Sequence, residues 1–282
     1  MDLSIVTVNT NDKNILRQIK SVIESTKNIE FEQIVSDNGS TDNSLEEIRS
    51  KFPEVKIVEN KKNIGFGKAN NSGVNISTGK YVLLLNPDME VQSGSLEKIV
   101  KWMDDHKDVG LVSCKLVDSE GKFSKNAAPR RFPKLVDQLA ILLKLPHVLP
   151  KIVNKYLLTD FDETQEQEVD SVRGSFMLLR KEIIAKLGWA FDPRYFIWFE
   201  DVDTCREVKK LGYKVMYTPI ISCVDLIGQT FKKQPTYQKQ VWFTGSMLKY
   251  FKKWEPWYKW MWIAIFRPVA LLLTLVVGKF KK

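Results

Sequence analysis

Cysteine and histidine are scarce in this chain of 282 residues. Its three cysteines, Cys114, Cys205 and Cys223, are an odd number without a CxxC pair, and the only histidines are His106 and His147. This composition argues against a disulfide-stapled scaffold and against a metal cluster built on Cys and His. Each cysteine stands among apolar neighbours, so we expect reduced and buried thiols.

Several patterns with well-understood functions are also missing. No GxGxxG follows the first apolar run and no GxxxxGK[ST] occurs, which disfavours the usual dinucleotide-binding fold and the P-loop. The N-terminus enters a strand-like run at once, so no secretory signal is expected. Apolar residues make up 44% of the chain and charged residues 27%, which excludes a disordered chain. Only the last few dozen residues approach a membrane-spanning run, which excludes a polytopic membrane protein.

Acidic residues are nearly absent from the C-terminal segment. Residues 232–282 contain 11 Lys and Arg but one acid, Glu255, although the whole chain carries only +9. Five of the eight tryptophans lie in the same segment: Trp242, Trp254, Trp257, Trp260 and Trp262. Tryptophan beside lysine is typical of a lipid headgroup layer, and the apolar run Ile263–Val277 would have no use on a nucleic acid. We therefore expect a membrane surface as partner and no nucleic acid.

The apolar part of this tail is interrupted by Arg267-Pro268. The uninterrupted part, Val269–Val277, would measure about 14 Å as a helix, whereas a bilayer core is about 30 Å thick. We therefore expect an interfacial or re-entrant helix rather than a span. A buried core helix, or a contact with a second copy in a homodimer, is the alternative.

Strand-like and helix-like segments alternate over roughly the first 90 residues, which predicts a parallel α/β sheet. Polar clusters follow three of the strands, at Asn9–Asp12, Asp37–Asp42 and Asn86–Asp88. Ligands of such sheets bind at the carboxyl ends of the strands. The predicted strands are Leu3–Val8, Phe31–Val35, Val55–Val58 and Tyr81–Leu85, and the predicted helices are Ile15–Ser25, Leu45–Phe52 and Ala69–Ile76.

The pattern changes in the second half of the chain. An apolar stretch, Leu135–Leu158, is broken by Pro146 and Pro150. The remaining predicted elements are a helix at Leu96–Met103, strands at Gly110–Leu116, Val169–Leu179 and Val215–Ile221, and a helix from Val202.

Acidic residues stand where they could do chemistry. Glu200, Asp201 and Asp203 directly follow the aromatic run Tyr195–Phe199. Acids at a helix N-terminus are favourable for the helix dipole alone, yet a carboxylate in a partly desolvated pocket is also how a general base is made. Asp37 and Asp88 have the same two interpretations, as turn formers or as ligands.

Six short segments occur in a fixed order over residues 3–230: Ile5–Asn11, Val35–Asp42, Asn63–Phe66, Leu85–Asp88, Val172–Met177 and Phe199–Cys205. In this order they resemble family 2 glycosyltransferases, in the branch rich in rhamnosyltransferases acting on lipid-linked sugars. The resemblance implies an α/β GT-A fold with a Rossmann-like mixed sheet over residues 1–231. Residues 1–116 would bind the nucleotide sugar and residues 117–231 the acceptor, and residues 232–282 would form a basic, Trp-rich, membrane-associating segment.

The resemblance implies a nucleotide pocket made by residues near the strand ends. Asp37 would accept a hydrogen bond from the imide N–H of uracil or thymine. Thr7 and Asn9 would line the same pocket. The complete implied set is Thr7, Asn9, Asp37, Asn63, Gly65, Phe66 and Asn86.

The resemblance also implies a metal ligand and a base. Asp88 ends a DxD-like motif, here Asn86-Pro87-Asp88, and would bind Mg²⁺ or Mn²⁺ that bridges the donor diphosphate. Asp201 matches the family's general base and would deprotonate the acceptor hydroxyl, which predicts inversion. Glu200 and Asp203 would orient the acceptor or cap the helix. We expect Asp37, Asp88 and Asp201 to surround one cavity.

One segment departs from the family pattern. Members commonly have an H-x-x-G-x-S segment after the last core strand, and here Asp225 replaces the histidine and Thr230 the serine. Aspartate is a good ligand for Mg²⁺ or Mn²⁺, so Asp225 is a candidate second metal ligand. Aspartate cannot donate to a phosphate, which leaves open a catalytically weak nucleotide-sugar-binding subunit of a membrane glycan assembly complex.

The acceptor side is implied by basic residues. Arg130 and Arg131 precede the broken apolar stretch and would clamp an acceptor diphosphate, although a solvated face is the alternative. Gly174 would lie at the acceptor or diphosphate. Lys232-Lys233 would clamp the acceptor diphosphate in the same way, or would instead contact the donor diphosphate. The leading hypothesis is an inverting transferase in cell-surface polysaccharide synthesis, cytoplasmic and peripheral on the inner face of the membrane. The resemblance favours dTDP-rhamnose as donor over a UDP-hexose or UDP-N-acetylhexosamine. It favours a membrane or lipid-linked glycan as acceptor.

Overall fold

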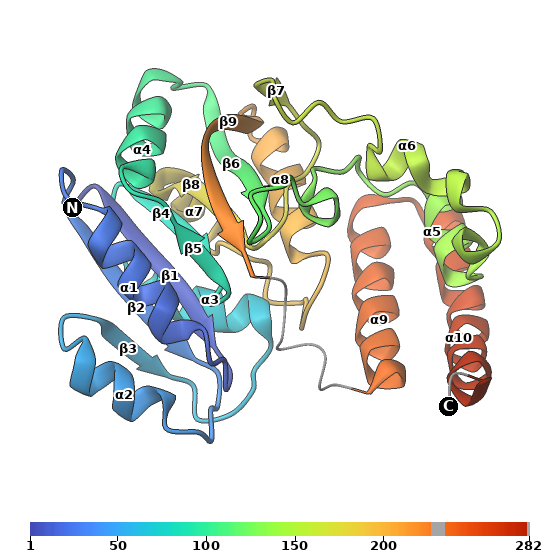
Figure 1. Ribbon diagram of the computed structural model, residues 1–282. Coiled ribbons are helices and arrows are strands. Elements are labelled where there is room, and N and C mark those ends of the chain that lie inside the picture. The colour runs from blue at the N-terminus through green and yellow to red at the C-terminus, as the bar shows by residue number, and fades with distance from the viewer. Residues whose placement is uncertain (227–234, 281–282) are drawn as a thin grey trace.

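The computed structural model describes residues 1–226 and 235–280, and Figure 1 shows a central sheet with helices packed around it. Within these residues the sheet has nine strands in the order β3-β2-β1-β4-β8-β6-β9-β5, with β7 paired to β9. The strands are β1 (Leu3–Asn9), β2 (Phe31–Asp37), β3 (Lys56–Glu59), β4 (Tyr81–Leu85), β5 (Met89–Val91), β6 (Val109–Val117), β7 (Gln167–Glu168), β8 (Phe176–Arg180) and β9 (Lys214–Asp225).

The sheet is mixed, as the resemblance implies. Strands β3, β2, β1 and β4 are parallel, whereas β8 runs antiparallel to β4 and β6, and β5 runs antiparallel to β9. The helices are α1 (Ile15–Ser25), α2 (Ser44–Lys51), α3 (Phe66–Asn75), α4 (Ser95–Asp105), α5 (Leu135–Leu142), α6 (Asn154–Leu157), α7 (Lys181–Leu187), α8 (Glu200–Lys210), α9 (Thr236–Trp254) and α10 (Trp257–Phe280). Short 3₁₀ turns lie at Lys125–Ala127, Leu145–His147 and Pro150–Val153.

Side chains of the central strands enter two separate cores. Leu3 and Ile5 of β1 share a core with Leu96 of α4, whereas Val6 shares the other with Val74 of α3. A strand that is buried on both faces requires a continuous apolar run, because neither set of side chains meets water. This packing fixes the positions of the strand ends, where the polar clusters begin.

Most predicted elements are confirmed, the helix Ile15–Ser25 and the strand Tyr81–Leu85 at the expected residues. The strand expected over Val169–Leu179 is wrong in its first half, because β8 begins only at Phe176. The antiparallel strand β5 was not expected, since three residues are too few to show an alternating pattern.

The helix that contains the apolar part of the tail is longer than the run Val269–Val277, and the interfacial or re-entrant placement stays a prediction. Helix α10 continues through Pro268 for 24 residues, which is about 36 Å at the α-helical rise. Arg267 packs against α9, where its Nε donates to Thr244 Oγ1 at 3.2 Å, and this tertiary contact helps to stabilise a helix that Pro268 alone would weaken. The window Trp257–Leu275 is long and apolar enough to cross a membrane by length and composition, and 17% of it is buried. The helix is therefore compatible with a membrane-associating tail.

A buried cluster of charges anchors α9 to α8. Lys253 Nζ lies 2.7 Å from Asp203 Oδ2, 3.0 Å from Asp192 Oδ2 and 2.8 Å from Glu207 Oε1. Trp254 Nε1 donates to Asp203 Oδ1 at 2.6 Å. Burial raises the pKa of Asp203, and its hydrogen bond with Lys253 opposes that shift. The cluster joins the C-terminal helix pair to the helix that begins with the acidic run.

Lys253→Met should lower the free energy of unfolding by about 3–5 kcal/mol, because it leaves buried carboxylates without their cation. The adjacent Lys252 is exposed, so Lys252→Met should change that free energy by about 0.5 kcal/mol or less. Urea titrations followed by circular dichroism measure both values. Equal losses in the two variants would contradict the anchoring role of the cluster.

Candidate active site

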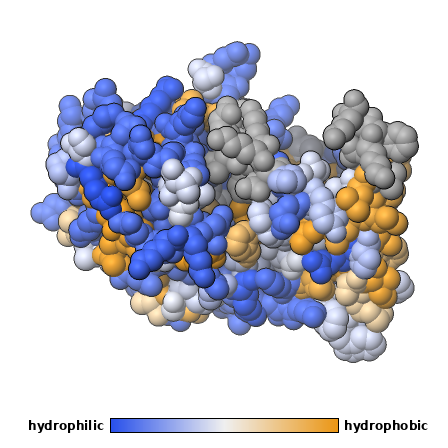
Figure 2. Space-filling view, turned by 90° about the horizontal axis from the view of Figure 1, so that it is seen from below, coloured by the Kyte–Doolittle hydropathy of each residue, from blue (hydrophilic) through white to orange (hydrophobic). Residues whose placement is uncertain are grey.

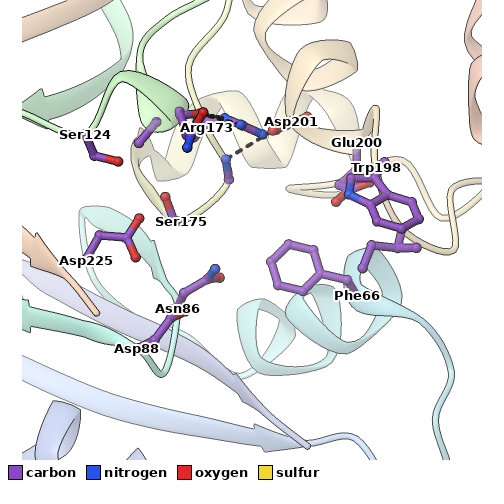
Figure 3. A pocket seen from close by; sticks show the side chains of 14 residues that line it. Phe66, Asn86, Asp88, Ser124, Arg173, Ser175, Trp198, Glu200, Asp201 and Asp225 are labelled. Atoms are coloured by element: carbon purple, nitrogen blue, oxygen red, sulfur yellow. Dashed lines mark hydrogen bonds between the residues drawn. The ribbon is translucent and has the colours of Figure 1, made fainter. Parts of the chain in front are cut away.

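Loops and helix ends around one edge of the sheet enclose a cavity of about 250 Å³. Figure 3 shows Asp88 and Asp225 on one side of it, and Trp198 and Glu200 on the other. Seven of the residues predicted from the sequence line the cavity: Phe66, Asn86, Asp88, Gly174, Glu200, Asp201 and Asp225.

Strand pairing brings Asp88 and Asp225 close together. β5 runs antiparallel to the end of β9 with Met89 opposite Asp225, and the Leu226 N–H donates to the Asp88 carbonyl at 2.9 Å. Burial raises the pKa of the Cys223 thiol, and the charges of Asp225 and Asp88 add to that rise. Both carboxylates line the same cavity.

The donor set fits a divalent cation that is shared with a substrate. Among the residues described, no group of three or more His, Cys, Asp or Glu side chains could hold a metal ion. Mg²⁺ is usually bound through one or two carboxylates, while phosphate oxygens and waters complete its coordination. Asp88 and Asp225 supply such a pair, and oxygen ligands suit Mg²⁺ or Mn²⁺. The two carboxylates therefore fit one of these ions, with oxygens of a bound substrate completing its coordination.

Asp201 lies in the first turn of α8 and is held by two backbone groups. Its Oδ2 accepts a hydrogen bond from the Gly174 N–H at 3.2 Å, and its Oδ1 accepts one from the Val202 N–H at 2.8 Å. The contact with Gly174 is dashed in Figure 3. The side chain is partly exposed, so its direction is fixed while a substrate can still reach it. A carboxylate that is fixed in direction and open to a substrate suits the role of general base that the sequence predicts for Asp201.

Glu200 precedes Asp201 in the sequence but is more deeply buried. Burial, and then the Asp201 charge, raises the pKa of Glu200 well above its usual range. Its Oε2 is buried without a hydrogen-bond partner in the described part of the chain. The preceding Trp198 and Phe199 have φ angles of 64° and 70°, a left-handed conformation that costs about 1–3 kcal/mol for such residues. A strained turn therefore leads into the N-terminus of α8.

Asn9 and Asp37, two of the predicted nucleotide-binding residues, lie together at the ends of β1 and β2. Asn9 Nδ2 is 3.4 Å from Asp37 Oδ1. The Gly39 and Ser40 N–H groups both donate to Asp37 Oδ2 at 3.1 Å, so this carboxylate holds the turn after β2. Asp37 lies outside the cavity that the other two expected acids share, which corrects the expectation of one common cavity. Its proposed contact with a base N–H stays a prediction.

Three more predicted nucleotide-binding residues also lie outside the cavity. Thr7 is buried in β1, and its Oγ1 has no hydrogen-bond partner among residues 1–226 and 235–280. Asn63 Oδ1 accepts from the Gly65 N–H at 3.0 Å. Gly65 has a φ of 92°, and a Cβ there would lie 2.7 Å from the Phe196 carbonyl oxygen, so glycine is required. This loop leads directly into Phe66, which does line the cavity.

The structure separates the predicted acceptor residues. Arg130 lines a second cavity that includes Asp201, whereas Arg131 lines a third one, of about 750 Å³. They are therefore not placed as one clamp. Asp203 points away from all of these cavities because its carboxylate binds Lys253, which corrects its expected contact with an acceptor. The remaining predicted residues lie outside the described part of the chain: Thr230, Lys232 and Lys233.

Several lining residues had no predicted role. Arg173 and Ser175 belong to the segment Val172–Met177, so their place beside Gly174 is a usable signal. Ser124 and Asn126 have no such signal, because they belong to a loop that only the fold brings here. The Asn126 carbonyl accepts a hydrogen bond from Arg173 Nε at 3.0 Å.

The chain belongs to glycosyl transferase family 2, whose model matches residues 4–188. It is 25% identical over 198 residues to the N-acetylglucosaminyl-diphospho-decaprenol L-rhamnosyltransferase of Mycobacterium tuberculosis. This match covers 66% of this chain and 63% of that protein. It is 27% identical over 167 residues to the rhamnosyltransferase WbbL of Escherichia coli. This match covers 57% of this chain and 60% of that protein. The matches thus span less than two thirds of these relatives.

Solved structures confirm the GT-A fold. The mannosyltransferase PcManGT of Pyrobaculum calidifontis, in complex with GDP-Man and Mn²⁺, superposes with a TM-score of 0.61 at 18% identity, over 97% of this chain and 73% of that one. Staphylococcus aureus TarS 1–349, in complex with UDP-GlcNAc, superposes with a TM-score of 0.55 at 17% identity, over 88% of this chain and 67% of that one.

Asp88→Asn should weaken Mn²⁺-dependent binding of a nucleoside diphosphate at least about tenfold, because it removes one of two carboxylate ligands. Titration calorimetry with UDP and with dTDP measures this, and a chelator should reduce the parent to the affinity of the variant. The control Asp105→Asn changes an exposed acid on α4 and should leave affinity unchanged. An affinity that responds neither to chelator nor to Asp88→Asn would contradict the assignment.

Proposed function

We propose that this protein is an inverting, metal-dependent glycosyltransferase that moves a sugar from a nucleotide sugar to a lipid-linked or other membrane glycan. The observation that carries the proposal is the cavity shared by Asp201 and the Asp88–Asp225 pair. A base and a metal-binding pair on one cavity are what a sugar transfer needs, because the acceptor is deprotonated while a diphosphate leaves. Membership of family 2 supports this chemistry.

In the proposed reaction Asp201 takes the proton of the acceptor hydroxyl. The oxygen then attacks the anomeric carbon from the face opposite the diphosphate, so that one displacement inverts the configuration. The N–H groups of Gly174 and Val202 keep the carboxylate aimed at that proton. A bound divalent cation would supply neutralisation of the charge on the leaving diphosphate. Asp88 and Asp225 would hold that cation, and Arg173 adds a further positive charge to the cavity wall.

The donor and acceptor are proposed from the relatives. Two of them are named rhamnosyltransferases, which favours dTDP-rhamnose over a UDP-hexose or UDP-N-acetylhexosamine. The name of the mycobacterial relative specifies a sugar on diphospho-decaprenol, which favours a polyprenyl-diphosphate-linked acceptor here. A role in cell-surface polysaccharide synthesis follows from that choice.

Asp201→Asn should lower kcat at least about 100-fold, since it removes the general base, while the donor KM stays unchanged. Glu200→Gln should cost less than about tenfold near neutral pH, because the raised pKa keeps Glu200 largely protonated there and glutamine resembles that form. As the pH rises through the pKa of Glu200, the parent gains a negative charge beside Asp201 and its kcat should change. The kcat of Glu200→Gln should not change over the same pH range. Release of nucleoside diphosphate with donor and acceptor measures these rates.

The same assay separates the alternative function. A parent protein that binds a nucleotide sugar but neither hydrolyses nor transfers it would favour the nucleotide-sugar-binding subunit. Undiminished transfer by Asp201→Asn would remove that residue as the base.

We also propose that α10 attaches the protein to the inner face of the cell membrane. Exposed apolar and aromatic side chains recur every three or four residues along this helix, at Tyr258, Trp262, Ile265, Val269 and Leu272, which places them on one face. Figure 2 shows hydrophobic residues gathered at the end of the molecule formed by the C-terminal helices. Together with the basic residues of the tail, this face suits an anionic bilayer and a cytoplasmic active site.

The double variant Trp262→Ser, Leu272→Ser should reduce the fraction that pellets with phosphatidylglycerol liposomes at least about tenfold, because two apolar side chains no longer enter the lipid. Ile220→Ser is the control, since Ile220 is an exposed apolar residue on β9. High salt should also weaken pelleting of the parent. Equal pelleting of all three proteins would contradict the proposal.

A further inference from the structure

A second cavity, also of about 250 Å³, adjoins the candidate active site. The two cavities share Arg173, Trp198 and Asp201 among their lining residues. Asp88 and Asp225 line the first cavity but not the second. A molecule in the second cavity can therefore reach the proposed base without entering the space of the metal-binding pair.

Part of the lining of the second cavity is apolar. It includes Ile141 of α5, Leu157 of α6 and Phe243 of α9. Helix α5 also packs against α10, beside which it lies in Figure 1. Val136 of α5 is itself 72% exposed. The apolar wall thus belongs to the same group of helices as the surface proposed to meet the membrane.

Two arginines, Arg130 and Arg173, line the second cavity as well. Within the described residues the Arg130 side chain makes no hydrogen bond or ion pair. Both residues line this one cavity, and burial, and then the Arg130 cation, lowers the pKa of Arg173. Guanidinium groups bind phosphate oxygens through paired, charge-assisted hydrogen bonds, and an anion between two of them would relieve their repulsion.

We propose that the second cavity binds a diphosphate joined to an apolar chain, which is the acceptor class of the proposed transfer reaction. The inference rests on that proposed function. The acceptor hydroxyl reaches Asp201, the diphosphate binds Arg130 and Arg173, and the chain follows Ile141 toward the C-terminal helices. Arg131 faces another cavity and takes no part.

Geranyl diphosphate is a suitable probe because it joins a diphosphate to a short apolar chain. Its binding to the full chain is measured by calorimetry with Mn²⁺ and a saturating nucleoside diphosphate, which occupy the first cavity. The parent should bind it, and Arg130→Gln and Ile141→Asn should each raise Kd at least about tenfold, because one loses a charge-assisted contact and the other apolar contact. Arg49→Gln, an exposed arginine of α2, is the matched control and should leave Kd unchanged.

Geraniol and inorganic diphosphate, tested alone, should each bind at least about tenfold more weakly than the joined probe, because each makes only half of the contacts. An unchanged Kd in both folded variants would overturn the inference. So would binding that disappears whenever nucleoside diphosphate is present, since the arginine pair would then serve the donor. Should Arg130→Gln not fold, Arg130→Lys tests the same contact with the charge retained.

This measurement requires no sugar transfer. A protein that binds the probe as expected but never turns over a donor keeps the second site and loses the proposed function. A protein that turns over a donor but does not bind geranyl diphosphate loses only the second site.

Discussion

The pairing of β9 with β5 is the constraint on which the site depends. β9 first runs parallel to β6 and then shifts register between Thr218 and Ser222, before it pairs antiparallel with β5. Pro219 lies within the shift, where a residue without an N–H is tolerated, and such bulges re-aim the following side chains. The re-aimed strand end brings Asp225 to Asp88. Without it, the end of β4 would offer one carboxylate to a diphosphate-bound cation instead of two.

The C-terminal helices are tied to the loop and the helix that carry Asp201, the proposed base. Lys253 of α9 binds Asp203 of α8, two residues beyond Asp201. Ser246 Oγ of α9 also donates to the Ile197 carbonyl at 2.8 Å, within the loop that precedes α8. Helix α9, which packs against the helix proposed to meet lipid, therefore also holds the turn that precedes Asp201. Attachment to a membrane would leave the base in place, because the contacts that fix it are internal to the chain.

The sequence predicts the features of this fold that are local. The β-branched run of β1 and the helical spacing of α1 need only their own residues, and both are confirmed. The positions of Asp88 and Asp225 beside one another depend on strand order, which no local pattern contains. The direction of the Asp203 side chain, in contrast, can be predicted from the sequence, because it depends only on the geometry of one helix. Two residues along an α-helix turn the side chain by about 200°, so an acidic run cannot direct both Asp201 and Asp203 into one cavity.

The same argument applies to Arg130 and Arg131. Arg130 forms an isolated antiparallel bridge with Ser171, and neighbouring side chains of an extended segment point to opposite sides. One guanidinium consequently lines the cavity of Asp201, and the other lines the cavity that includes Lys259 of α10. Two cations that look equivalent in the sequence thus face different surfaces. Only Arg130 can act together with Arg173, and that pair lies where a diphosphate would separate a reacting hydroxyl from an apolar chain.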